Sequence, residues 1–482
     1  MCGITGSWNF KMDIDNSLKL LNHRGPDSNG YLKKDKVIMT INRLAIVDPK
    51  KGKQPMLDND KELSIVYNGE IYNHMQIRSQ LKKYKFKTKS DTETLLYLYK
   101  KLGERCLEKL DGMFAFCTYD GKKLFLARDR FGIKPLYYVN KKDFFVFSSE
   151  KKILILNGFG EKDIKKLDPG HYILYNGKKI IIKKYYDIKI PGKKITNEKA
   201  AARSLKIMLK NSIKNRELAD VKIGTLLSGG IDSSIISAVL AKDISSLKSF
   251  TVGLKNSEDL HFAKVASDHI GIRNYSKVFS EKDTYQIIPK VVFHLEAWLP
   301  LAVRNAIPTY FVSQLAKKHV KVVLCGEGAD ELFGGYPLFS NSKNLNKDII
   351  EHLKRIDWVN LNRVDKMSMA SSIEARVPFL DHNFVELSLS ICETLKQNKY
   401  EKYILRKAFQ HDLPKEIINR PKLGFQSGSG VRNILKDKVI ERYKNEENFY
   451  KKIYNDIFYS ENAWNNKFFN ALGKEVAEKL NL

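Results

Sequence analysis

The chain has 482 residues, of which 43% are hydrophobic and 29% charged, which is typical of a globular protein with two or three domains and not of a disordered chain. No apolar run reaches the about 20 residues that span a membrane, and the N-terminus lacks the features of a secretory signal, so we expect a cytoplasmic protein with no membrane partner. The net charge is +29, but the lysines are spread along the chain, which indicates a solvated basic surface and no specific nucleic-acid site.

Residues 1–190 are predicted to form mainly strands and turns. Apolar, β-prone runs occur at Val37–Ile41, Leu63–Tyr67, Phe114–Tyr119, Leu124–Ala127 and Phe144–Ser148. Asn176-Gly177, between the runs Tyr172–Tyr175 and Lys179–Ile182, indicates a hairpin. One helix is predicted after Ser90, because Ser90–Glu93 resembles a capping box and leucines follow at helical spacing.

Residues 191–482 are predicted to form a second domain, which begins with the linker Pro191–Lys194. Strands and helices then alternate. The predicted strands are Lys222–Leu227, Ser249–Gly253, Tyr275–Phe279 and Lys321–Cys325, and the predicted helices are Ser233–Ala241 and His261–Ile270. This alternation favours a parallel sheet. From about Asn346 the chain is predicted to be helical to its end.

The five cysteines contain no Cys-x-x-Cys pair, which argues against a disulfide framework or a zinc site. Cys2 is different, because removal of Met1 would make it the N-terminal residue. Its thiol, with a free pKa of about 8.5, and its α-amine, at about 7.7–8.0, would then place a nucleophile beside its own general base. Taken alone, a cysteine at position 2 is better explained by chance.

An ordered set of motifs changes that balance. They are Met1–Ile4, Arg24–Asp27, Arg43–Asp48, Tyr67–Asn73, Ser90-Asp91 and Asp129–Gly132. Each is weak alone, but together they resemble the class II glutamine amidotransferase domain, an N-terminal-nucleophile hydrolase. The resemblance covers nearly all of residues 1–190 and implies an α+β fold of layered antiparallel sheets with helices.

The resemblance also implies roles for individual residues. Arg43 would bind the carboxylate of glutamine in a bidentate pair, and Asp91, with Glu70 nearby, would receive the ammonium group. Cys2 would attack the side-chain amide. The side-chain amide of Asn68 and the backbone N–H of Gly69 would stabilise the oxyanion; Asn68-Gly69 could at the same time be a tight turn.

In the second half, a serine- and glycine-rich segment joins a predicted strand to a predicted helix. The residues concerned are Leu227, Ser228, Gly229, Gly230, Ile231, Asp232, Ser233 and Ser234. Glycines let the backbone approach a phosphate, and hydroxyls with the N–H groups of a helix start can bind it. The segment resembles the PP-loop of ATP pyrophosphatases, which cleave ATP to AMP and pyrophosphate, and no Walker A motif is present.

Further motifs narrow the family. They are Cys325–Tyr336, Arg363, Asp365, Ser368-Met369, Glu374–Asp381, Lys402, Leu405-Arg406 and Arg420–Phe425. With the first domain, the series resembles the glutamine-hydrolysing asparagine synthetase family from Cys2 to about Gln426. It implies an α/β PP-loop domain with a helical C-terminal part, in which ATP and aspartate form β-aspartyl-AMP that ammonia then attacks. The implied partners are small substrates, with a homodimer as a further expectation.

The family roles carry over to matching positions. Asp232 and Asp330 would bind Mg²⁺ on the pyrophosphate, and Lys402 would steady charge on the phosphates and adenylate. Leu227 and Val252 would hold adenine, Gly326 would lie at ATP, Glu327 would act as a proton acceptor, and Arg304 would lie near aspartate. Glu374 and Arg376 are either a structural ion pair or catalytic groups.

Two residues depart from the family pattern: Cys325 and Ala329 stand where many relatives have serine, which would weaken hydrogen bonding to ATP. The chain is also short at its C-terminus, and residues 427–482 are predicted only as a lysine-rich helical tail.

Four other functions compete with this prediction. A related amidotransferase could adenylate a different carboxylate, and a ring-closing β-lactam synthetase is disfavoured by the intact Cys2. A class I aminoacyl-tRNA synthetase is suggested by His269–Ile272 and Lys366–Met369, but each signature lacks one residue. A regulatory scaffold would be expected to lose catalytic positions, and none is lost.

Overall fold

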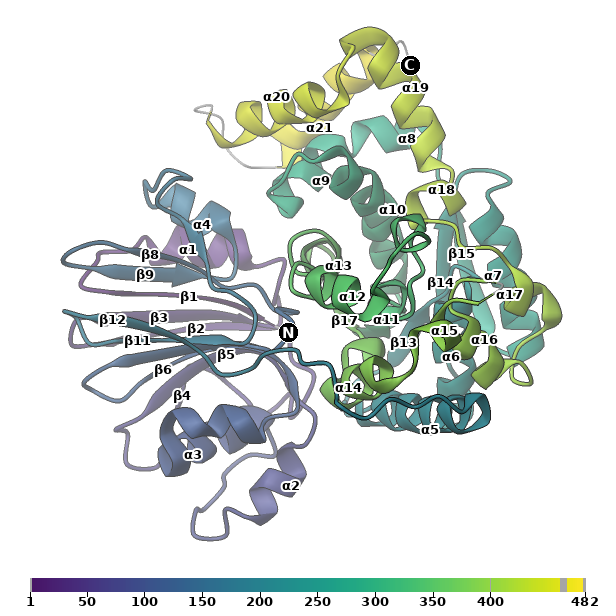
Figure 1. Cartoon of the computed structure of the whole chain (residues 1–482). Coiled ribbons are helices and arrows are strands. Elements are labelled where there is room, and N and C mark those ends of the chain that lie inside the picture. The colour runs from purple at the N-terminus through teal and green to yellow at the C-terminus, as the bar shows by residue number, and fades with distance from the viewer. Residues whose placement is uncertain (1, 399, 460–465, 480–482) are drawn as a thin grey trace. The chain divides into compact units, whose positions relative to one another are not determined.

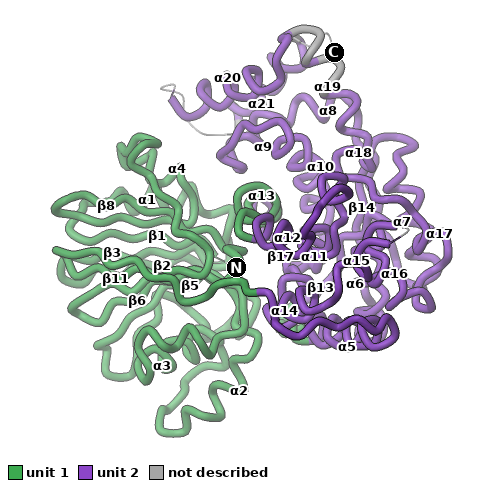
Figure 2. The backbone as a smooth tube through the Cα atoms, viewed as in Figure 1, with its two compact units in different colours: residues 1–189, 215–221, 354–365 green, residues 190–214, 222–353, 366–482 purple. Residues whose placement is uncertain are grey.

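The computed structural model describes residues 2–398, 400–459 and 466–479. These residues form two compact units, which Figure 2 shows in green and purple. The first unit contains residues 1–189 together with two short later segments, 215–221 and 354–365. The second unit contains residues 190–214, 222–353 and 366–482. Both later segments of the first unit lie beyond residue 190, at which the sequence predicted the domain boundary.

The first unit is built on two antiparallel six-stranded sheets. One has the order β10-β8-β9-β1-β3-β2 and the other the order β12-β11-β7-β6-β5-β4. The strands of the first sheet are β1 (Cys2–Trp8), β2 (Ser28–Lys34), β3 (Val37–Arg43), β8 (Tyr137–Asn140), β9 (Phe145–Ser148) and β10 (Lys165–Lys166). Those of the second are β4 (Met56–Leu57), β5 (Ser64–Ile71), β6 (Gly112–Tyr119), β7 (Leu124–Arg128), β11 (His171–Tyr175) and β12 (Ile180–Lys184).

The two sheets enclose an apolar core, and helices cover their outer faces. Ile4 and Ile41 of the first sheet pack with Val66 and Leu126 of the second, all fully buried. Figure 1 shows α1 (Ile14–Leu21) and α4 (Lys151–Leu156) on one side and α2 (His74–Ser79) and α3 (Asp91–Leu102), followed by a 3-10 turn at Gly103–Lys109, on the other. The predicted layered fold class is confirmed, but the prediction of a single helix was wrong.

The start of α3 differs in detail from the expected capping box. Ser90 caps the helix by accepting the N–H of Thr92. The Glu93 carboxylate does not return to Ser90 and instead accepts the backbone N–H groups of Lys87 and Thr88. Glu93 therefore fastens the preceding loop, and Asp91 is held in the first turn of the helix.

The second unit contains a parallel five-stranded sheet of order β15-β14-β13-β16-β17. Its strands are β13 (Ile223–Leu226), β14 (Lys248–Gly253), β15 (Arg273–Val278), β16 (Val322–Leu324) and β17 (Glu374–Arg376). The chain leaves β13 toward β14 and β15 and later returns on the other side of β13 with β16. The carboxyl ends of β13 and β16 therefore form a topological switch point, where ligands of open α/β sheets bind.

Helices make up most of the rest of the second unit (Figure 1). Those up to residue 333 are α5 (Glu198–Asn215), α6 (Ile231–Leu240), α7 (Glu258–Ile270), α8 (Glu281–Gln286), α9 (Ile288–Leu295), α10 (Pro300–Ala316) and α11 (Ala329–Phe333). Later helices are α12 (Leu345–Leu353), α13 (Asn360–Met369), α14 (His382–Ser390), α15 (Glu393–Lys396), α16 (Tyr403–Phe409), α17 (Lys415–Asn419), α18 (Phe425–Gly428), α19 (Val431–Tyr443), α20 (Glu446–Phe458) and α21 (Asn466–Lys479). Short 3-10 turns occupy Pro337–Phe339 and Pro378–Leu380.

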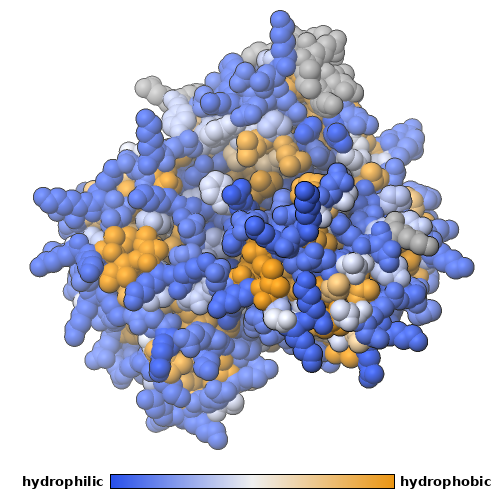
Figure 3. Space-filling model, viewed as in Figure 1, coloured by the Kyte–Doolittle hydropathy of each residue, from blue (hydrophilic) through white to orange (hydrophobic). Residues whose placement is uncertain are grey.

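Strand β17 corrects the prediction that the chain is helical from Asn346 to its end. The described part of the tail is helical as expected: α20 and α21 pack against α9, where the Phe293 and Phe469 ring centroids lie 4.7 Å apart. None of the described helices is long and apolar enough to cross a membrane. Hydrophilic side chains cover most of the face seen in Figure 3, interrupted by separate hydrophobic patches.

Candidate active site

Cys2 is the first residue of β1 and is almost fully buried, with 5% of its surface exposed. Its backbone N–H donates to Asn68 Oδ1 at 2.9 Å, and its carbonyl accepts from Arg24 Nε at 3.0 Å. Burial raises the pKa of the Cys2 thiol, while the charge of Arg43 and the N–H of Leu44 act in the opposite direction. The thiol therefore needs a base to become a nucleophile.

Asn68 and Gly69 lie next to Cys2 in the middle of β5. Asn68 is fully buried, and its Nδ2 has no hydrogen-bond partner among the residues that the structure describes. A Cβ at Gly69 would lie 2.1 Å from the Met113 carbonyl oxygen, so only glycine fits there. These residues lie within a strand, so Asn68-Gly69 does not form the tight turn that the sequence left open. A buried amide donor beside the thiol suits an oxyanion.

Arg43 ends β3 opposite Cys2 in the strand register. Its Nη1 donates to the Pro49 carbonyl at 2.9 Å, and its Nη2 donates to the carbonyls of Val47 at 3.1 Å and Asp48 at 2.9 Å. Three of the five guanidinium N–H groups are thereby used, and the other two have no partner in the described part of the chain. Arg43 therefore shapes the loop, and its charge together with a remaining N–H group can still attract a carboxylate.

The carboxylate of Asp91 is fixed by the N-terminus of α3. Its Oδ2 accepts from the Tyr67 hydroxyl at 2.9 Å and the Ile71 N–H at 3.0 Å, and its Oδ1 accepts from the Thr92 N–H at 2.9 Å. Glu70, 3% exposed, lies on β5 and lines the same pocket as Cys2, where its charge adds to the rise in the thiol pKa that burial causes. Two carboxylates suit an ammonium group.

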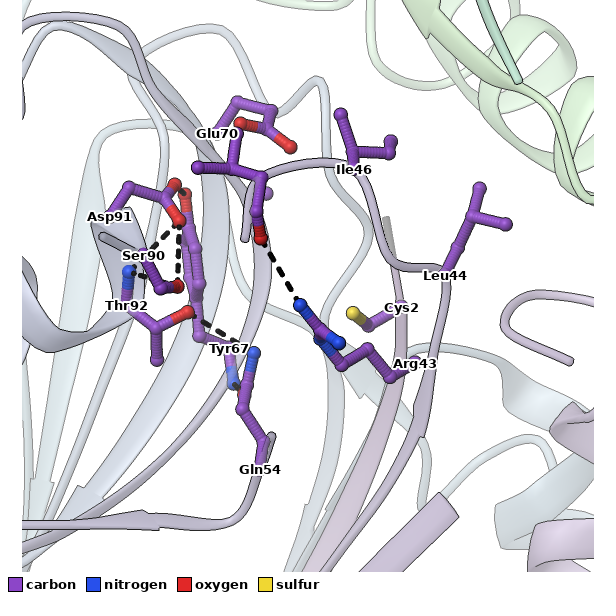
Figure 4. Close-up of a pocket in the computed structure, with 12 residues that line it drawn as sticks. Cys2, Arg43, Leu44, Ile46, Gln54, Tyr67, Glu70, Ser90, Asp91 and Thr92 are labelled. Atoms are coloured by element: carbon purple, nitrogen blue, oxygen red, sulfur yellow. Dashed lines mark hydrogen bonds between the residues drawn. The ribbon is translucent and has the colours of Figure 1, made fainter. Parts of the chain in front are cut away.

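Figure 4 shows these side chains around one pocket. Of the predicted residues, Cys2, Arg43, Gly69, Glu70 and Asp91 line it, and Asn68 joins them through its bond to Cys2. The structure adds residues that the sequence did not single out: Leu44, Ile46, Val47, Gln54, Tyr67, Ser90 and Thr92. Most belong to the motifs already noted; Gln54 does not, and no sequence signal marks it.

The ATP-site candidates of the second unit gather at the switch point of the parallel sheet. Gly229 has a φ of +70°, and a Cβ there would lie 2.2 Å from the Phe262 backbone, so the turn requires glycine. Ser228 and Ser233 hydroxyls lie 3.3 Å apart across the turn. The Ser234 hydroxyl is buried without a hydrogen-bond partner among the described residues. No side chain caps α6, so its first N–H groups can bind an anion.

Two carboxylates and two lysines meet beside this loop. Lys402 Nζ lies 2.5 Å from Asp232 Oδ2 and 2.6 Å from Asp330 Oδ1, and Lys422 Nζ lies 2.5 Å from Asp330 Oδ2. Burial alone would raise the pKa of Asp330, but the two lysines lower it to about 2. Lys402 itself is fully buried in a left-handed conformation, with a φ of +59°. A non-glycine residue in that conformation is uncommon.

Lys422 is a site residue that sequence reasoning missed. Its motif, Arg420–Phe425, belongs to the family resemblance but predicts no role for this lysine. In the structure Arg420 fastens the loop, because its Nη1 donates to the Ser228 carbonyl at 2.8 Å and its Nη2 to Asp259 Oδ1 at 3.0 Å. The only sequence signal for Lys422 is its position two residues after Arg420 in this motif, because lysine is common throughout the chain.

The remaining ATP-site candidates occupy neighbouring strands. Leu227 is held by its N–H to the Phe250 carbonyl at 3.0 Å, and Val252 is fully buried on β14. A Cβ at Gly326 would lie 2.8 Å from the Cβ of Asp232, so the loop after β16 touches the start of α6. Glu327 follows; its charge, after burial, helps to raise the pKa of Glu331 to about 7.

Other predicted site residues form ion pairs or hydrogen bonds with other residues of the protein, or are buried. Arg304 Nη1 lies 3.5 Å from Glu446 Oε2, and Arg376 Nε lies 2.6 Å from Glu374 Oε1, so Glu374 and Arg376 form a buried ion pair. The Cys325 thiol donates weakly to the Arg376 carbonyl at 3.6 Å, and Ala329 is fully buried. His269 lies in the last turn of α7 and does not open a helix, unlike the tRNA synthetase signature.

Comparison with known proteins gives the family. A glutamine amidotransferase domain model matches residues 1–162, and an asparagine synthase model matches residues 204–360 and 340–473. An asparagine synthetase [glutamine-hydrolyzing] of Triphysaria versicolor is 35% identical and covers 85% of this chain and 74% of its own length. One of Bacillus subtilis is 31% identical over 92% of this chain and 91% of its own length.

A probable asparagine synthetase [glutamine-hydrolyzing] of Schizosaccharomyces pombe is 35% identical, with coverage of 91% and 86%. A solved glutamine PRPP amidotransferase from B. subtilis is 19% identical with a TM-score of 0.34, covering 52% of this chain and 65% of that one. The matches to the two family models and to these full-length relatives extend over both halves of the sequence. The chain belongs to the glutamine-hydrolysing asparagine synthetase family.

Proposed function

We propose that this protein makes asparagine from aspartate, glutamine and ATP, and releases glutamate, AMP and pyrophosphate. The observation that carries the proposal is the pocket around Cys2, in which Arg43, Glu70 and Asp91 surround a buried thiol. One cation and two anions complement the α-carboxylate and α-ammonium groups of glutamine. Glutamine bound in this way presents its side-chain amide to the thiol.

The first reaction releases ammonia. Removal of Met1 gives Cys2 a free α-amine, which takes the thiol proton, and the sulfur then bonds to the amide carbon of glutamine. Asn68 Nδ2 and the Gly69 N–H hold the resulting oxyanion. The C–N bond breaks, the amine returns its proton to the leaving ammonia, and water cleaves the glutamyl thioester to give glutamate and the free thiol.

The second reaction activates aspartate at the Ser228–Ser234 loop. The aspartate β-carboxylate bonds to the α-phosphorus of ATP and the bond to pyrophosphate breaks, which gives β-aspartyl-AMP. Ammonia then bonds to the carbonyl carbon of the activated β-carboxyl group and AMP leaves, with Glu327 as acceptor of the surplus proton. Lys402 and Lys422, which both contact Asp330, would bind the negative charge on the phosphates.

The donor set beside the loop fits Mg²⁺. Asp232 and Asp330 supply carboxylate oxygens, and Asp232 Oδ1 is buried with no hydrogen-bond partner in the described residues. Mg²⁺ usually takes one or two carboxylates together with substrate phosphates and water. When bound, it would offset the charge of the triphosphate, while Lys402 and Lys422 would turn from the aspartates to the phosphates.

Other assignments remain predictions. They are the homodimer, the cytoplasmic location, the contact of Arg304 with aspartate, and the binding of adenine by Leu227 and Val252. The basic surface carries no assignment to nucleic acid.

Replacing the nucleophile tests the proposal. Cys2→Ala should abolish glutamine-dependent asparagine formation and leave the ammonia-dependent reaction intact. Cys392→Ala, at a half-buried cysteine in the second unit, is the matched control and should support both reactions. Chromatography of the nucleotides should show AMP and no ADP. Loss of both reactions in folded Cys2→Ala, or production of ADP, would contradict the proposal, as would another amino acid replacing aspartate in a substrate screen.

A further inference from the structure

Arg24 connects the nucleophile to a segment from the second half of the sequence. Its side chain is fully buried in the first unit, and its Nε donates to the Cys2 carbonyl at 3.0 Å. Its Nη1 lies 2.9 Å from Glu150 Oε1 and 2.8 Å from Asp365 Oδ2, and its Nη2 donates to Asp365 Oδ1 at 3.2 Å. Asp365 therefore holds both terminal nitrogens of the guanidinium that binds Cys2.

Asp365 is the last residue of segment 354–365, which belongs to the first unit. Its carboxylate is 2% exposed and also lies 3.3 Å from Lys134 Nζ. Burial alone would lower the pKa of Arg24, but the charges of Asp365 and Glu150 raise it above its usual value. The guanidinium thus stays charged, and its plane is set by two carboxylates.

We propose that Asp365 is a positioning residue for glutamine hydrolysis, which acts through Arg24 to fix the main chain of Cys2. The proposal rests on the proposed role of Cys2 as nucleophile. Neither Asp365 nor Arg24 lines the glutamine pocket, so they affect the reaction only through the orientation of Cys2.

The physical reason is that Cys2 is proposed to be the terminal residue of the mature chain. The ends of chains are poorly ordered unless they are tied down. The Arg24 bond to the carbonyl and the Asn68 bond to the nitrogen hold Cys2 from two directions. If Arg24 turns away, the thiol loses its alignment with the oxyanion donors, and a misplacement of about 1 Å can cost about 100-fold in rate.

A second aspartate of the same segment provides the control that distinguishes a merely structural role of Asp365 from the proposed positioning role. Asp357 also forms buried ion pairs, with Arg128 at 2.8 Å and Lys166 at 2.6 Å. In the described structure Arg128 otherwise binds carbonyls of Gly132, Lys134 and Leu167, and not Cys2. Asp357→Asn therefore weakens the same segment without touching the nucleophile.

The test compares Asp365→Asn with Asp357→Asn in the full-length protein. Asp365→Asn keeps the shape of the side chain, and Glu150 remains as counter-ion of Arg24. We expect Asp365→Asn to lower the kcat of glutamine hydrolysis by about 10- to 100-fold and to leave the KM for glutamine unchanged. We also expect it to change the rate at which iodoacetamide alkylates Cys2, which peptide mass spectrometry measures. Asp357→Asn should change neither, and ammonia-dependent synthesis should persist in both. If Asp365→Asn does not fold, Arg24→Lys tests the same link with the same expected result.

Equal effects of the two asparagine variants, an effect confined to KM, or an unchanged alkylation rate would overturn the inference. The alkylation measurement needs no turnover. Failure of the proposed function would appear as a parent enzyme that hydrolyses no glutamine, whereas failure of this inference would leave the parent active and Cys2 equally reactive in both variants.

Discussion

One amide group, that of Asn68, serves Cys2 in two ways. Its Oδ1 accepts the Cys2 N–H at 2.9 Å, while its Nδ2 is buried and has no partner among the described residues. A buried amide donor without a partner costs free energy unless a ligand satisfies it. The arrangement is therefore suited to an oxyanion that forms only during the reaction, because that oxygen would give Nδ2 its missing acceptor.

Asn68→Asp separates these two functions. It keeps an oxygen for the Cys2 N–H but replaces the donor with an acceptor, so we expect the kcat of glutamine hydrolysis to fall by about 100- to 1,000-fold, with ammonia-dependent synthesis retained. Steady-state kinetics with both nitrogen donors measure this. Asn73→Ala is the control, since the Asn73 amide bonds to Lys109 and Asp111 outside the pocket. A loss of less than about tenfold would show that Nδ2 does not stabilise the oxyanion.

Gly52 determines where the guanidinium of Arg43 can lie. A Cβ at Gly52 would lie 2.6 Å from Arg43 Nη2 and 3.0 Å from the Asp48 carbonyl that this nitrogen binds. Gly52→Ala should therefore displace Arg43, weaken binding of the glutamine carboxylate and raise the KM for glutamine by about tenfold, which corresponds to loss of one charge-assisted hydrogen bond.

The control for this substitution is Gly160→Ala, because a Cβ at Gly160 meets no atom within 4 Å. Its KM should equal that of the parent. If Gly52→Ala instead lowers kcat at constant KM, Arg43 acts on the reaction step and not on binding.

Much of the fold follows from sequence patterns, but several of its strands do not. Apolar runs such as Phe114–Tyr119 predict strands because both faces of these sheets are buried. β17 has only three residues, two of which are the paired charges Glu374 and Arg376, so no hydrophobic pattern marks it. β1 begins with glycine-rich sequence and was recognised only as the surroundings of Cys2.

Sequence patterns likewise predict only part of the site. The resemblance of the ordered motifs to a known family identified Cys2, Arg43 and Asp91, because each lies in a distinctive run of residues. It could not show that Arg43 also binds the carbonyls of its own loop, or that Lys422 reaches Asp330 across 92 positions of sequence. Such contacts depend on how loops return to the same end of a sheet, and a lysine-rich sequence does not distinguish Lys422 from the lysines that make no such contact.

Lys422 provides a test of that contact. Lys422→Met keeps the length of the side chain but removes its charge, so asparagine synthesis from either nitrogen donor should fall by about 100-fold or more, while glutamine hydrolysis persists. Lys206→Met is a matched control, because Lys206 also pairs with a carboxylate at 2.5 Å, that of Asp412. Equal activities of the two variants would exclude a role for Lys422 in the chemistry.

Lys396 gives a prediction about stability. It is fully buried in α15, and its Nζ donates to Asn346 Oδ1 at 2.8 Å. Burial lowers the pKa of Lys396 to about 7, with the charge of Glu393 opposing this only in part, whereas the unfolded value is about 10.4. Between these values the unfolded chain binds a proton that the folded chain has lost, so stability rises with pH by up to about 1.4 kcal/mol per unit.

Lys396→Met removes this titration. We expect the variant to be more stable than the parent at pH 7, because methionine has no proton to lose on burial, and we expect the difference in free energy of unfolding to shrink as the pH rises from 7 to 10. Denaturant unfolding followed by circular dichroism measures both proteins, with Lys415→Met, at an exposed lysine, as control. A difference that stays constant over this pH range would mean that Lys396 keeps its proton in the folded protein, and that its bond to Asn346 is a charged one.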